Sequence, residues 1–468
     1  MAADRELGLG AAREQALTRG VGLLQEAWRS FDSPRPGQPP ISDATRALTA
    51  GPLPEDGVGA EVGLDDAARL LDESLAQSRP RFFGYVGSSG LEVAVLADAL
   101  AAAHDVNVAS RAAAADLVES QTIRWVGEFV GFPASAGVFT SGGMVSTLTA
   151  LAAARERALP GSRIEGVGSG GVVYAAAEAH SSVERAVEIL GLGRRALHPV
   201  PVDGRRRMSP AALAGMIAAD RQAGLVPLAV VATAGTTLTG AVDPLRPIGE
   251  LCRGQRIWMH VDGAYGLPAA ATPQAGPQFD GLELADSASL DAHKWLFVPK
   301  ACGVLLVRDR SDLEAAFSHR AAYMPAEEDE RHPVEWTLEY SRPFRALKLW
   351  LAFRVHGAQA FREAIGRNLD LARLLADLVR DSPDLELVCR PTLSIVCFRR
   401  RPAQGDPDRH NARLATALQR DGRVYVTTAV VDGLTCLRPC IVNFRTTDAD
   451  VRALIEVVRE VGARVEDG

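Results

Sequence analysis

Between about residues 90 and 310, long alanine- and leucine-rich helical segments alternate with short apolar runs. These runs lie at 171–175, 228–233, 257–261 and 303–307. They are rich in β-branched residues and do not alternate with polar ones, which is typical of strands covered on both faces. Helices that alternate with buried strands predict an α/β domain with a mostly parallel sheet. Such sheets bind ligands at the carboxyl ends of their strands, where Asp262, Thr236 and His180 fall.

We expect three parts in this chain. They are an N-terminal helical segment at 1–88, a large α/β domain at 89–345, and a small C-terminal α+β domain with its connecting helix at 346–468. Helical spacing of apolar residues over about 10–32 predicts an amphipathic helix, and the proline-rich stretch 33–40 ends it. This arm could pack on its own domain or on a second subunit.

The C-terminal third is predicted in less detail. The stretch 308–343 is polar and irregular, and a long loop in a compact domain is usually either disordered or functional. A helical pattern returns from Arg345. Strands are expected at 385–389, 393–398, 423–427 and 436–444, followed by a final helix from Asp448.

Composition narrows the class of protein. Of the 468 residues, 47% are hydrophobic and 23% are charged, as in soluble globular proteins. The net charge of −7, with both signs mixed, does not favour nucleic acid or an anionic membrane as a partner. We find neither a secretion signal nor a run of about 18 apolar residues, so we expect a cytoplasmic protein without a membrane span. The six cysteines contain no CxxC pair, which predicts buried free thiols and no metal site.

Asp262 and Lys294 are the most informative residues for function. Asp262 ends the apolar run 257–261, and Lys294 follows 32 residues later in a second strand-turn. A carboxylate can keep a pyridine nitrogen protonated and a lysine can form a Schiff base, which together would hold pyridoxal phosphate (PLP). Ala264 is small enough for a flat ring to lie over it. The alternatives are an acid that only caps a turn and a surface lysine, although the apolar residues 295–299 weigh against the latter.

Three weaker signals fall at other strand and helix ends. The turn Gly142–Gly143 precedes a helix, so its backbone N–H groups could bind a phosphate or merely cap the helix. His180 could stack on a cofactor ring, or be a helix-start histidine capped by Ser181 or Ser182. The hydroxyls at 236–237 could contact a ring substituent or only shape a turn. Their occurrence together with Asp262 and Lys294 favours a cofactor site.

These motifs resemble those of the group II PLP-dependent amino-acid decarboxylases, the family of aromatic-L-amino-acid and glutamate decarboxylases. The resemblance runs from about residue 80 to residue 447. It is most specific at Asp291–Trp295, with His260–Asp262 upstream. The resemblance implies a type I aminotransferase-like PLP fold, with a small C-terminal α+β domain. It also implies a homodimer whose active sites are shared between subunits.

The resemblance also implies a role for individual residues. Lys294 would be the Schiff-base lysine, Asp262 would contact the pyridine nitrogen, and His180 would stack on the ring. Further cofactor contacts are expected at Gly143, Met144, Thr237, Ala264, Asp291 and His293. The substrate contacts expected are Tyr85, Val106, Val108 and Arg445, the last near the substrate entrance.

This sequence departs from the family pattern at two points. Relatives often have asparagine at the position of Asp291, and an acid beside a phosphate needs another partner to offset the repulsion. The family's loop tyrosine, which protonates the carbanion left by CO2, aligns with 332–333, where this chain has His-Pro. Tyr323 lies in the same loop but out of register with the family's tyrosine. It is our candidate for protonating the carbanion, as a third catalytic residue beside Lys294 and His180.

Three functions follow from this pattern. The first is decarboxylation of an L-amino acid to its amine, and the second couples decarboxylation to oxidative deamination, which yields an aldehyde. The third is a PLP-binding homologue without catalysis. No clear basic pair marks a second substrate carboxylate, although Arg79, Arg81 and Arg342 are nearby, so we favour an aromatic or apolar substrate.

Overall fold

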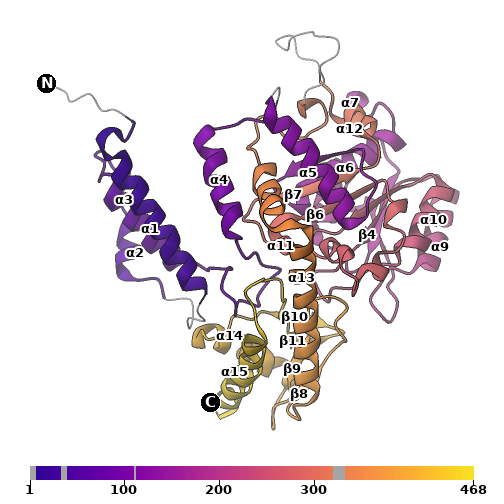
Figure 1. Cartoon of the computed structure of the whole chain (residues 1–468). Coiled ribbons are helices and arrows are strands. Elements are labelled where there is room, and N and C mark those ends of the chain that lie inside the picture. Colours follow the sequence, from indigo (N-terminus) through magenta and orange to yellow (C-terminus); the bar gives the residue numbers. More distant parts are fainter. Residues whose placement is uncertain (1–6, 33–39, 110–111, 320–332, 468) are drawn as a thin grey trace.

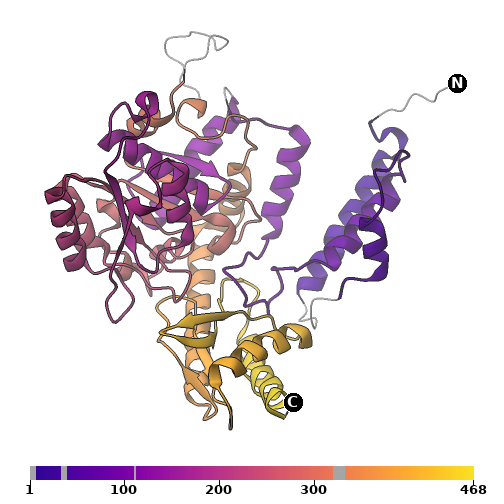
Figure 2. The same cartoon turned by 180° about the vertical axis from the view of Figure 1, so that it is seen from behind.

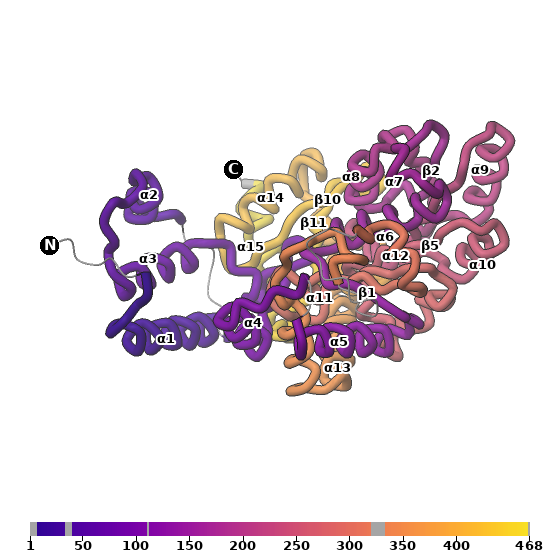
Figure 3. The backbone as a smooth tube through the Cα atoms, turned by 90° about the horizontal axis from the view of Figure 1, so that it is seen from above, coloured from indigo at the N-terminus to yellow at the C-terminus, as the bar shows by residue number. Residues whose placement is uncertain are grey.

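The computed structural model describes residues 7–32, 40–109, 112–319 and 333–467 (Figure 1). The chain begins with an arm of three helices, α1 (Arg13–Phe31), α2 (Asp43–Thr49) and α3 (Ala60–Asp72). Figure 3 shows this arm at one side of the molecule, away from the central sheet. The predicted N-terminal amphipathic helix is therefore confirmed as α1. None of the described helices is long and apolar enough to cross a membrane.

A seven-stranded sheet organises the large domain, with strand order β1-β7-β6-β5-β4-β2-β3. Its strands are β1 (Ala136–Thr140), β2 (Gly171–Ala176), β3 (Leu197–Val200), β4 (Val226–Thr233), β5 (Trp258–Asp262), β6 (Ser287–Asp291) and β7 (Gly303–Val307). Only β7 runs antiparallel to its neighbours, β1 and β6. The remaining neighbours are parallel, which confirms the predicted mostly parallel sheet.

Helices cover both faces of this sheet, which explains why its strands lack polar alternation. In β2, Val172 and Tyr174 belong to one apolar core, whereas Val173 and Ala175 belong to another. One face packs on α6 (Gly143–Ala158), α8 (Ser181–Ile189) and α12 (Arg310–Phe317). The other packs on α4 (Glu92–His104), α5 (Ala114–Val130), α9 (Pro210–Gln222), α10 (Leu245–Gln255) and α13 (Ala346–Arg380). Because side chains of a strand point alternately to the two faces, every position of β2 is buried.

The small domain lies beyond α13 and below the large sheet in Figure 2. It contains a four-stranded antiparallel sheet of order β10-β11-β9-β8, packed against two helices. Its elements are β8 (Leu385–Leu387), β9 (Phe398–Arg400), α14 (Pro407–Asp421), β10 (Thr428–Val431), β11 (Leu434–Leu437) and α15 (Asp448–Asp467). The final helix begins at Asp448, as predicted.

Two of the predicted C-terminal strands are wrong in position. The strand predicted at 423–427 begins only at Thr428, and the one predicted at 436–444 covers Leu434–Leu437. The pair Asp432-Gly433 supplies the reason, because both residues have positive φ, of 52° and 78°. An Asp-Gly pair is a strong hairpin signal, and it centres the two strands on itself.

The strand predicted at 393–398 is also displaced, since β9 covers Phe398–Arg400. Before it, only an isolated bridge joins Ile395 to Cys440. The stretch 308–343 is likewise not irregular throughout. It contains α12, whose first turn is capped by the Asp309 carboxylate accepting from the Ser311 N–H. Tyr323 lies outside the described residues.

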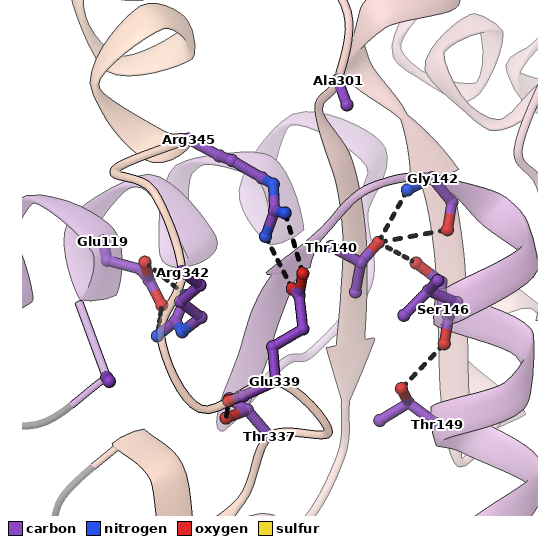
Figure 4. A network of polar contacts seen from close by, with 12 residues as sticks. Glu119, Thr140, Gly142, Ser146, Thr149, Ala301, Thr337, Glu339, Arg342 and Arg345 are labelled. Carbon is purple, nitrogen blue, oxygen red and sulfur yellow. Dashed lines mark hydrogen bonds and ion pairs between the residues drawn. The ribbon is translucent and has the colours of Figure 1, made fainter. Parts of the chain in front are cut away.

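A buried ion pair holds the segment before α13 against α5 (Figure 4). The two terminal guanidinium nitrogens of Arg342 donate to the Glu119 carboxylate, at 2.9 and 2.6 Å. The Arg342 side chain is only 1% exposed. Burial raises the pKa of Glu119, and the charge and hydrogen bonds of Arg342 oppose that rise. Three residues later, Arg345 makes a second bidentate pair with Glu339, at 2.6 and 2.9 Å.

Replacing Arg342 with alanine should destabilise the protein strongly. Removing one partner of a buried pair leaves the other charge unpaired, which typically costs about 3–5 kcal/mol. Urea denaturation monitored by circular dichroism would measure this loss. Arg246→Ala, which breaks the exposed pair with Asp280, should leave the denaturation midpoint nearly unchanged. Equal effects of the two substitutions would contradict a special role for the buried pair.

Candidate active site

A small cavity opens at the carboxyl ends of β4 and β5, beside the first turn of α6. Its lining residues come from five segments of the large domain. They are Gly143, Met144, His180, Ser182, Thr233, Gly235, Thr237, Asp262, Ala264, Tyr265, Asp291 and Lys294. Every cofactor contact expected from the sequence is among them except His293. The structure thus brings together residues that are up to 151 positions apart in the chain, from Gly143 to Lys294.

The glycine turn before α6 is built for a close approach of backbone. A Cβ atom on Gly143 would lie 2.8 Å from the Ala264 Cβ, so a side chain would close this corner of the cavity. The Thr140 hydroxyl braces the turn by accepting the Gly142 N–H at 3.2 Å, and it contacts the Ser146 hydroxyl at 2.8 Å (Figure 4). The N–H groups of Gly143 and Met144 lie in the first turn of α6, where backbone donors lack intrahelical acceptors. They are suited to an anion.

Lys294 forms an ion pair with Asp291, the acid whose charge would repel a nearby phosphate. Its Nζ lies 2.9 Å from Oδ2 of Asp291, whose carboxylate is almost fully buried. The other Asp291 oxygen is buried without a hydrogen-bond partner in the part of the chain that the structure describes. The positive charge of Lys294 therefore offsets the negative charge of the buried Asp291 carboxylate.

His293 supports this turn from outside the cavity. Its Nδ1 accepts the Cys302 N–H at 3.1 Å, and its Nε2 lies 3.7 Å from Oδ2 of Asp291. Burial is the main cause that lowers the pKa of His293, against the opposing charge of Asp291. A neutral imidazole that accepts a backbone hydrogen bond fixes the orientation of the short helix α11 (Ala292–Trp295), which carries Lys294.

Trp295 anchors the lysine turn to the rest of the molecule. Its indole is fully buried and stacks on Tyr265, with ring centroids 5.2 Å apart and an interplanar angle of 14°. The indole N–H donates to Oδ1 of Asn368 on α13, at 2.9 Å. Asn368 in turn donates to the Asn443 carbonyl, at 2.9 Å. The backbone of Lys294 is therefore held by contacts that reach the small domain.

Asp262 is the last residue of β5 and combines the two functions considered for it. Its Oδ1 accepts the Ala264 N–H at 3.1 Å, so the carboxylate does cap the following turn. The same carboxylate also lines the cavity and is 6% exposed. The hydrogen bond from the Ala264 N–H fixes the orientation of the Asp262 carboxylate, which still faces the cavity. A carboxylate held in this way is suited to contact one particular atom of a ligand.

His260 lies two residues before Asp262 and therefore points to the same face of β5. Trp258 donates its indole N–H to the Ser287 hydroxyl at 2.9 Å, and Nδ1 of His260 lies 2.9 Å from the same hydroxyl. Nε2 of His260 faces the Ser289 hydroxyl at 3.4 Å. Burial lowers the pKa of His260 to about 4.

The buried imidazole predicts acid sensitivity. The pKa of His260 falls from 6.5 to about 4 on folding, so its neutral form stabilises the native state fully above pH 6.5. That stabilisation, about 3 kcal/mol, is lost as the pH falls toward 4. Urea denaturation at pH 7 and pH 4.5 should show a smaller pH dependence for His260→Gln than for the unmodified protein. The exposed control His104→Gln should retain the full dependence, and an unaltered slope in His260→Gln would contradict the assignment.

His180 also combines a structural and a cavity position. It is the N-cap of α8, where its Nδ1 accepts the Ser182 N–H at 3.2 Å and contacts the Ser182 hydroxyl at 2.9 Å. These bonds fix the imidazole plane, while the ring still lines the cavity. The helix-capping alternative is thus correct and compatible with ring stacking.

The two threonines after β4 have different positions. The Thr236 hydroxyl accepts the Ala241 N–H at 3.1 Å and so shapes its own turn. Thr237 lines the cavity, and its carbonyl accepts from the guanidinium of Arg438 at 2.8 Å. Only Thr237 is therefore in a position to contact a ligand.

The structure does not bring the four expected substrate residues to this cavity. Val108 is fully buried within its own chain. Val106 is half-buried, and Tyr85 is half-exposed, with its hydroxyl 3.5 Å from that of Tyr425. The Arg445 guanidinium is occupied by the Glu92 carboxylate and the Ser89 carbonyl.

Two of the arginines considered as substrate partners are also occupied. Arg342 is buried against Glu119, and Arg81 pairs with Asp450 at 2.9 Å. Conversely, the cavity contains residues that were not singled out in the sequence: Ser182, Thr233, Gly235 and Tyr265. A signal was present for Gly235, because a glycine two residues past the end of a strand permits φ of +105°. A Cβ there would lie 2.9 Å from the Gly266 Cα.

The donor set of this cavity fits pyridoxal phosphate. The backbone N–H groups at the start of α6 suit its phosphate, and the Lys294 amine suits its aldehyde. The Asp262 carboxylate suits its pyridine nitrogen, and the His180 imidazole suits the face of its ring. The glycine at 143 and the small Ala264 leave the space that such a group requires.

Comparison with known proteins gives one consistent result. A family model described as the pyridoxal-dependent decarboxylase conserved domain matches residues 49–401. The aromatic-L-amino-acid decarboxylase of Bacillus atrophaeus is 33% identical over 438 residues, covering 91% of this chain and 90% of its own length. The L-2,4-diaminobutyrate decarboxylase of Rhizobium meliloti (strain 1021) is 34% identical over 425 residues, covering 89% and 84%. The crystal structure of Oryza sativa TDC with PLP and tryptamine has a TM-score of 0.92 at 27% identity and covers 99% of this chain and 100% of its own.

Proposed function

Since this chain belongs to the pyridoxal-dependent decarboxylases, we propose that it removes the α-carboxylate of an aromatic or apolar L-amino acid to give the amine and CO2. It is an amino-acid decarboxylase with the type I PLP fold, and its cofactor is pyridoxal phosphate. The observation that carries the proposal is the convergence of Lys294, Asp262, His180 and the first turn of α6 on one cavity.

Each of these residues has a distinct task in the proposed reaction. When bound, pyridoxal phosphate accepts the electron pair left at Cα by the departing carboxylate. Lys294 would bind its aldehyde carbon, and the Lys294 amine is afterwards available to move a proton. Asp262 would hold a proton on the pyridine nitrogen, with its carboxylate oriented by the Ala264 N–H. His180, fixed by Ser182, would hold the ring in plane.

Charge around the site supports a substrate without a second carboxylate. Two of the three arginines considered for such a carboxylate, Arg81 and Arg342, are neutralised by Asp450 and Glu119. The relatives act on different side chains by name, aromatic in one case and diaminobutyrate in another. We infer that an aromatic or apolar side chain fits best.

A substrate panel tests this proposal. Purified protein would be incubated with individual L-amino acids, and the amine, aldehyde and hydrogen peroxide would be measured with and without oxygen. We expect amine and CO2 from an aromatic or apolar amino acid, at equal rates in both atmospheres. Turnover of glutamate or diaminobutyrate alone would contradict the substrate proposal.

Oxidative deamination is the second candidate, because the aligned position of the family's loop tyrosine is occupied by His332-Pro333. A carbanion that is not promptly protonated survives long enough to react with oxygen. Formation of aldehyde and peroxide that ceases without oxygen would favour this function. Amine as the sole product would exclude it.

We further propose that the protein is a cytoplasmic homodimer with shared active sites. The helical arm exposes large apolar side chains, which a second subunit could cover: Leu17, Val21, Val62 and Leu71. The six free cysteines are in keeping with a reducing compartment. Sedimentation equilibrium should give twice the chain mass of 49.7 kDa. The double variant Leu17→Asp/Val21→Asp should shift the equilibrium toward monomer, and a monomeric unmodified protein would refute the proposal.

A further inference from the structure

An ion-pair network outside the cavity joins the turn that carries His180 to the small domain. The Arg206 guanidinium pairs with the Glu178 carboxylate through one terminal nitrogen and with the Asp432 carboxylate through the other. The side chains of Arg206 and Glu178 are partly buried, at 13% and 15% exposed, whereas that of Asp432 is 78% exposed. None of the three residues in this network lines the cavity itself.

Glu178 lies in the turn that leads into the N-cap of α8. The Ala179 N–H donates to the Ala176 carbonyl at 2.9 Å, which closes a tight turn directly after β2 with Glu178 inside it. His180 follows two residues after Glu178. In so short a turn, the position of the Glu178 backbone largely decides where the His180 backbone lies. Holding the Glu178 carboxylate therefore holds the imidazole from the strand side, while Ser182 holds it from the helix side.

Arg206 adopts a backbone conformation that favours glycine. Its φ is +63°, in the left-handed region that is sterically unfavourable for a residue with a Cβ. The turn is closed by the Arg206 N–H, which donates to the Asp203 carbonyl at 2.8 Å. A glycine would adopt this conformation without strain, so the turn itself does not require an arginine. Strain retained at one position indicates a role for the side chain that causes it.

The guanidinium is suited to hold two carboxylates at once. Its planar fork presents donors in fixed directions, whereas a lysine ammonium is a compact point charge. Burial raises the pKa of Glu178, and the charge and hydrogen bond of Arg206 oppose that rise. Without the guanidinium, the partly buried Glu178 would take up a proton or turn toward water. Either change would release the turn before α8.

The same hairpin of the small domain reaches the cavity at a second point. Asp432 lies between β10 and β11, at the tip of this hairpin, and Arg438 directly follows β11. The Arg438 guanidinium donates to the Thr237 carbonyl at 2.8 Å. Thr237 and His180 line the cavity from different segments of the large domain. The hairpin is therefore tethered to two segments of the cavity, to one directly and to the other through the ion-pair network.

We propose that Arg206 is a positioning residue for His180 and acts on it through Glu178. Its second ion pair, with Asp432, sets the same turn against the small domain. This inference rests on the proposed function in one respect, that the His180 imidazole lies on the face of the cofactor ring. Because Asp432 is exposed, solvent screens its pair, and we expect it to contribute less than the pair with Glu178.

The bound cofactor reports on the position of His180. Pyridoxal phosphate in a protein shows circular dichroism in its absorption band because its surroundings are asymmetric, so a displaced imidazole should change that signal. Arg206→Gly removes the guanidinium and relieves the backbone strain. We expect it to weaken the signal, to accelerate cofactor release on dilution, and to lower kcat by up to about 10²-fold, the cost of a displacement of about 1 Å. Arg206→Lys should give intermediate values.

Further variants distinguish positioning from a general loss of stability. Arg205 is exposed in the same turn, so Arg205→Ala removes an equal charge and should leave all three readouts unchanged. In a His180→Ala background, Arg206→Gly should lower kcat further by less than about twofold, because residues that act as a unit are not additive. Glu178→Gln should reproduce the Arg206→Gly result, and it carries the same test if Arg206→Gly does not fold. Asp432→Asn should have a smaller effect.

Two results would overturn the proposal. Equal cofactor signals from the unmodified protein and Arg206→Gly would show that the network does not position the imidazole. An undiminished loss of kcat when Arg206→Gly is added to His180→Ala would show that Arg206 acts by another route. The cofactor signal does not depend on which amino acid is turned over, so it tests this inference separately from the substrate. Unmodified protein that binds the cofactor but forms no amine would contradict the proposed function alone.

Discussion

Alanine in place of Lys294 is expected to abolish covalent cofactor attachment and to lower kcat by about 10⁴-fold or more, the scale for loss of a member of a catalytic unit. The side chain lines the cavity, and its Nζ is 2.9 Å from Asp291. No other lysine lines that cavity in the described residues. Borohydride reduction followed by peptide mass spectrometry would locate the attached cofactor, and amine release would give the rate.

A matched control is Lys300→Ala. Lys300 lies six residues further along, and its Nζ donates to the Gln77 side chain at 2.6 Å instead of lining the cavity. Removing it changes the charge equally and should leave the borohydride adduct on Lys294. An adduct on another lysine would contradict the assignment. Amine release by Lys294→Ala at the unmodified rate would contradict it as well, and would refute a catalytic role for this cavity.

Asparagine in place of Asp262 is expected to lower kcat by about 10²–10³-fold, the usual effect of removing one electrostatic contact to developing charge. Asparagine retains a carbonyl oxygen for the Ala264 N–H but cannot keep the pyridine nitrogen protonated. The turn should therefore persist while the electron-accepting capacity of the cofactor falls. Steady-state kinetics with the best substrate of the panel would measure the loss.

Asp286→Asn provides the control at the opposite end of β5. Asp286 accepts the Met259 N–H at 2.8 Å and pairs with Arg157, far from the cavity lining. It should affect stability more than kcat. A thermal melt of Asp262→Asn that matches the unmodified protein, together with its reduced kcat, would separate chemistry from folding. Retention of full kcat would show that Asp262 only caps its turn.

The large domain could be predicted from sequence because its signals are local. Unbroken apolar runs at β2, β4, β5 and β7 reflect burial on both faces, and each run carries that information within a few residues. The cofactor residues of the cavity were recognisable for the same reason, since they lie at or near the end of a strand or the start of a helix.

The substrate residues could not be predicted in this way, because their environment comes from distant segments. Arg342 is a candidate anion site by charge, but Glu119, more than 200 positions earlier, already neutralises it. Val108 is small and apolar, and only its packing shows that it is inaccessible. The displaced strands on either side of Asp432-Gly433 have a different explanation. The Asp-Gly pair is a local hairpin signal, and the strand boundaries predicted from sequence did not take it into account.

The hydrogen bonds from Trp295 to Asn368 and from Asn368 to Asn443 have a consequence for engineering. Asn443 also donates to the carbonyls of Ser78 and Arg79, both at 3.0 Å, so this one chain of contacts joins the region after the arm, the lysine turn, α13 and the C-terminal region. A cut between the two domains would leave buried indole and amide groups without partners on both sides. The small domain therefore cannot be exchanged for that of a relative as a module unless α13 and the Trp295 contact are transferred with it.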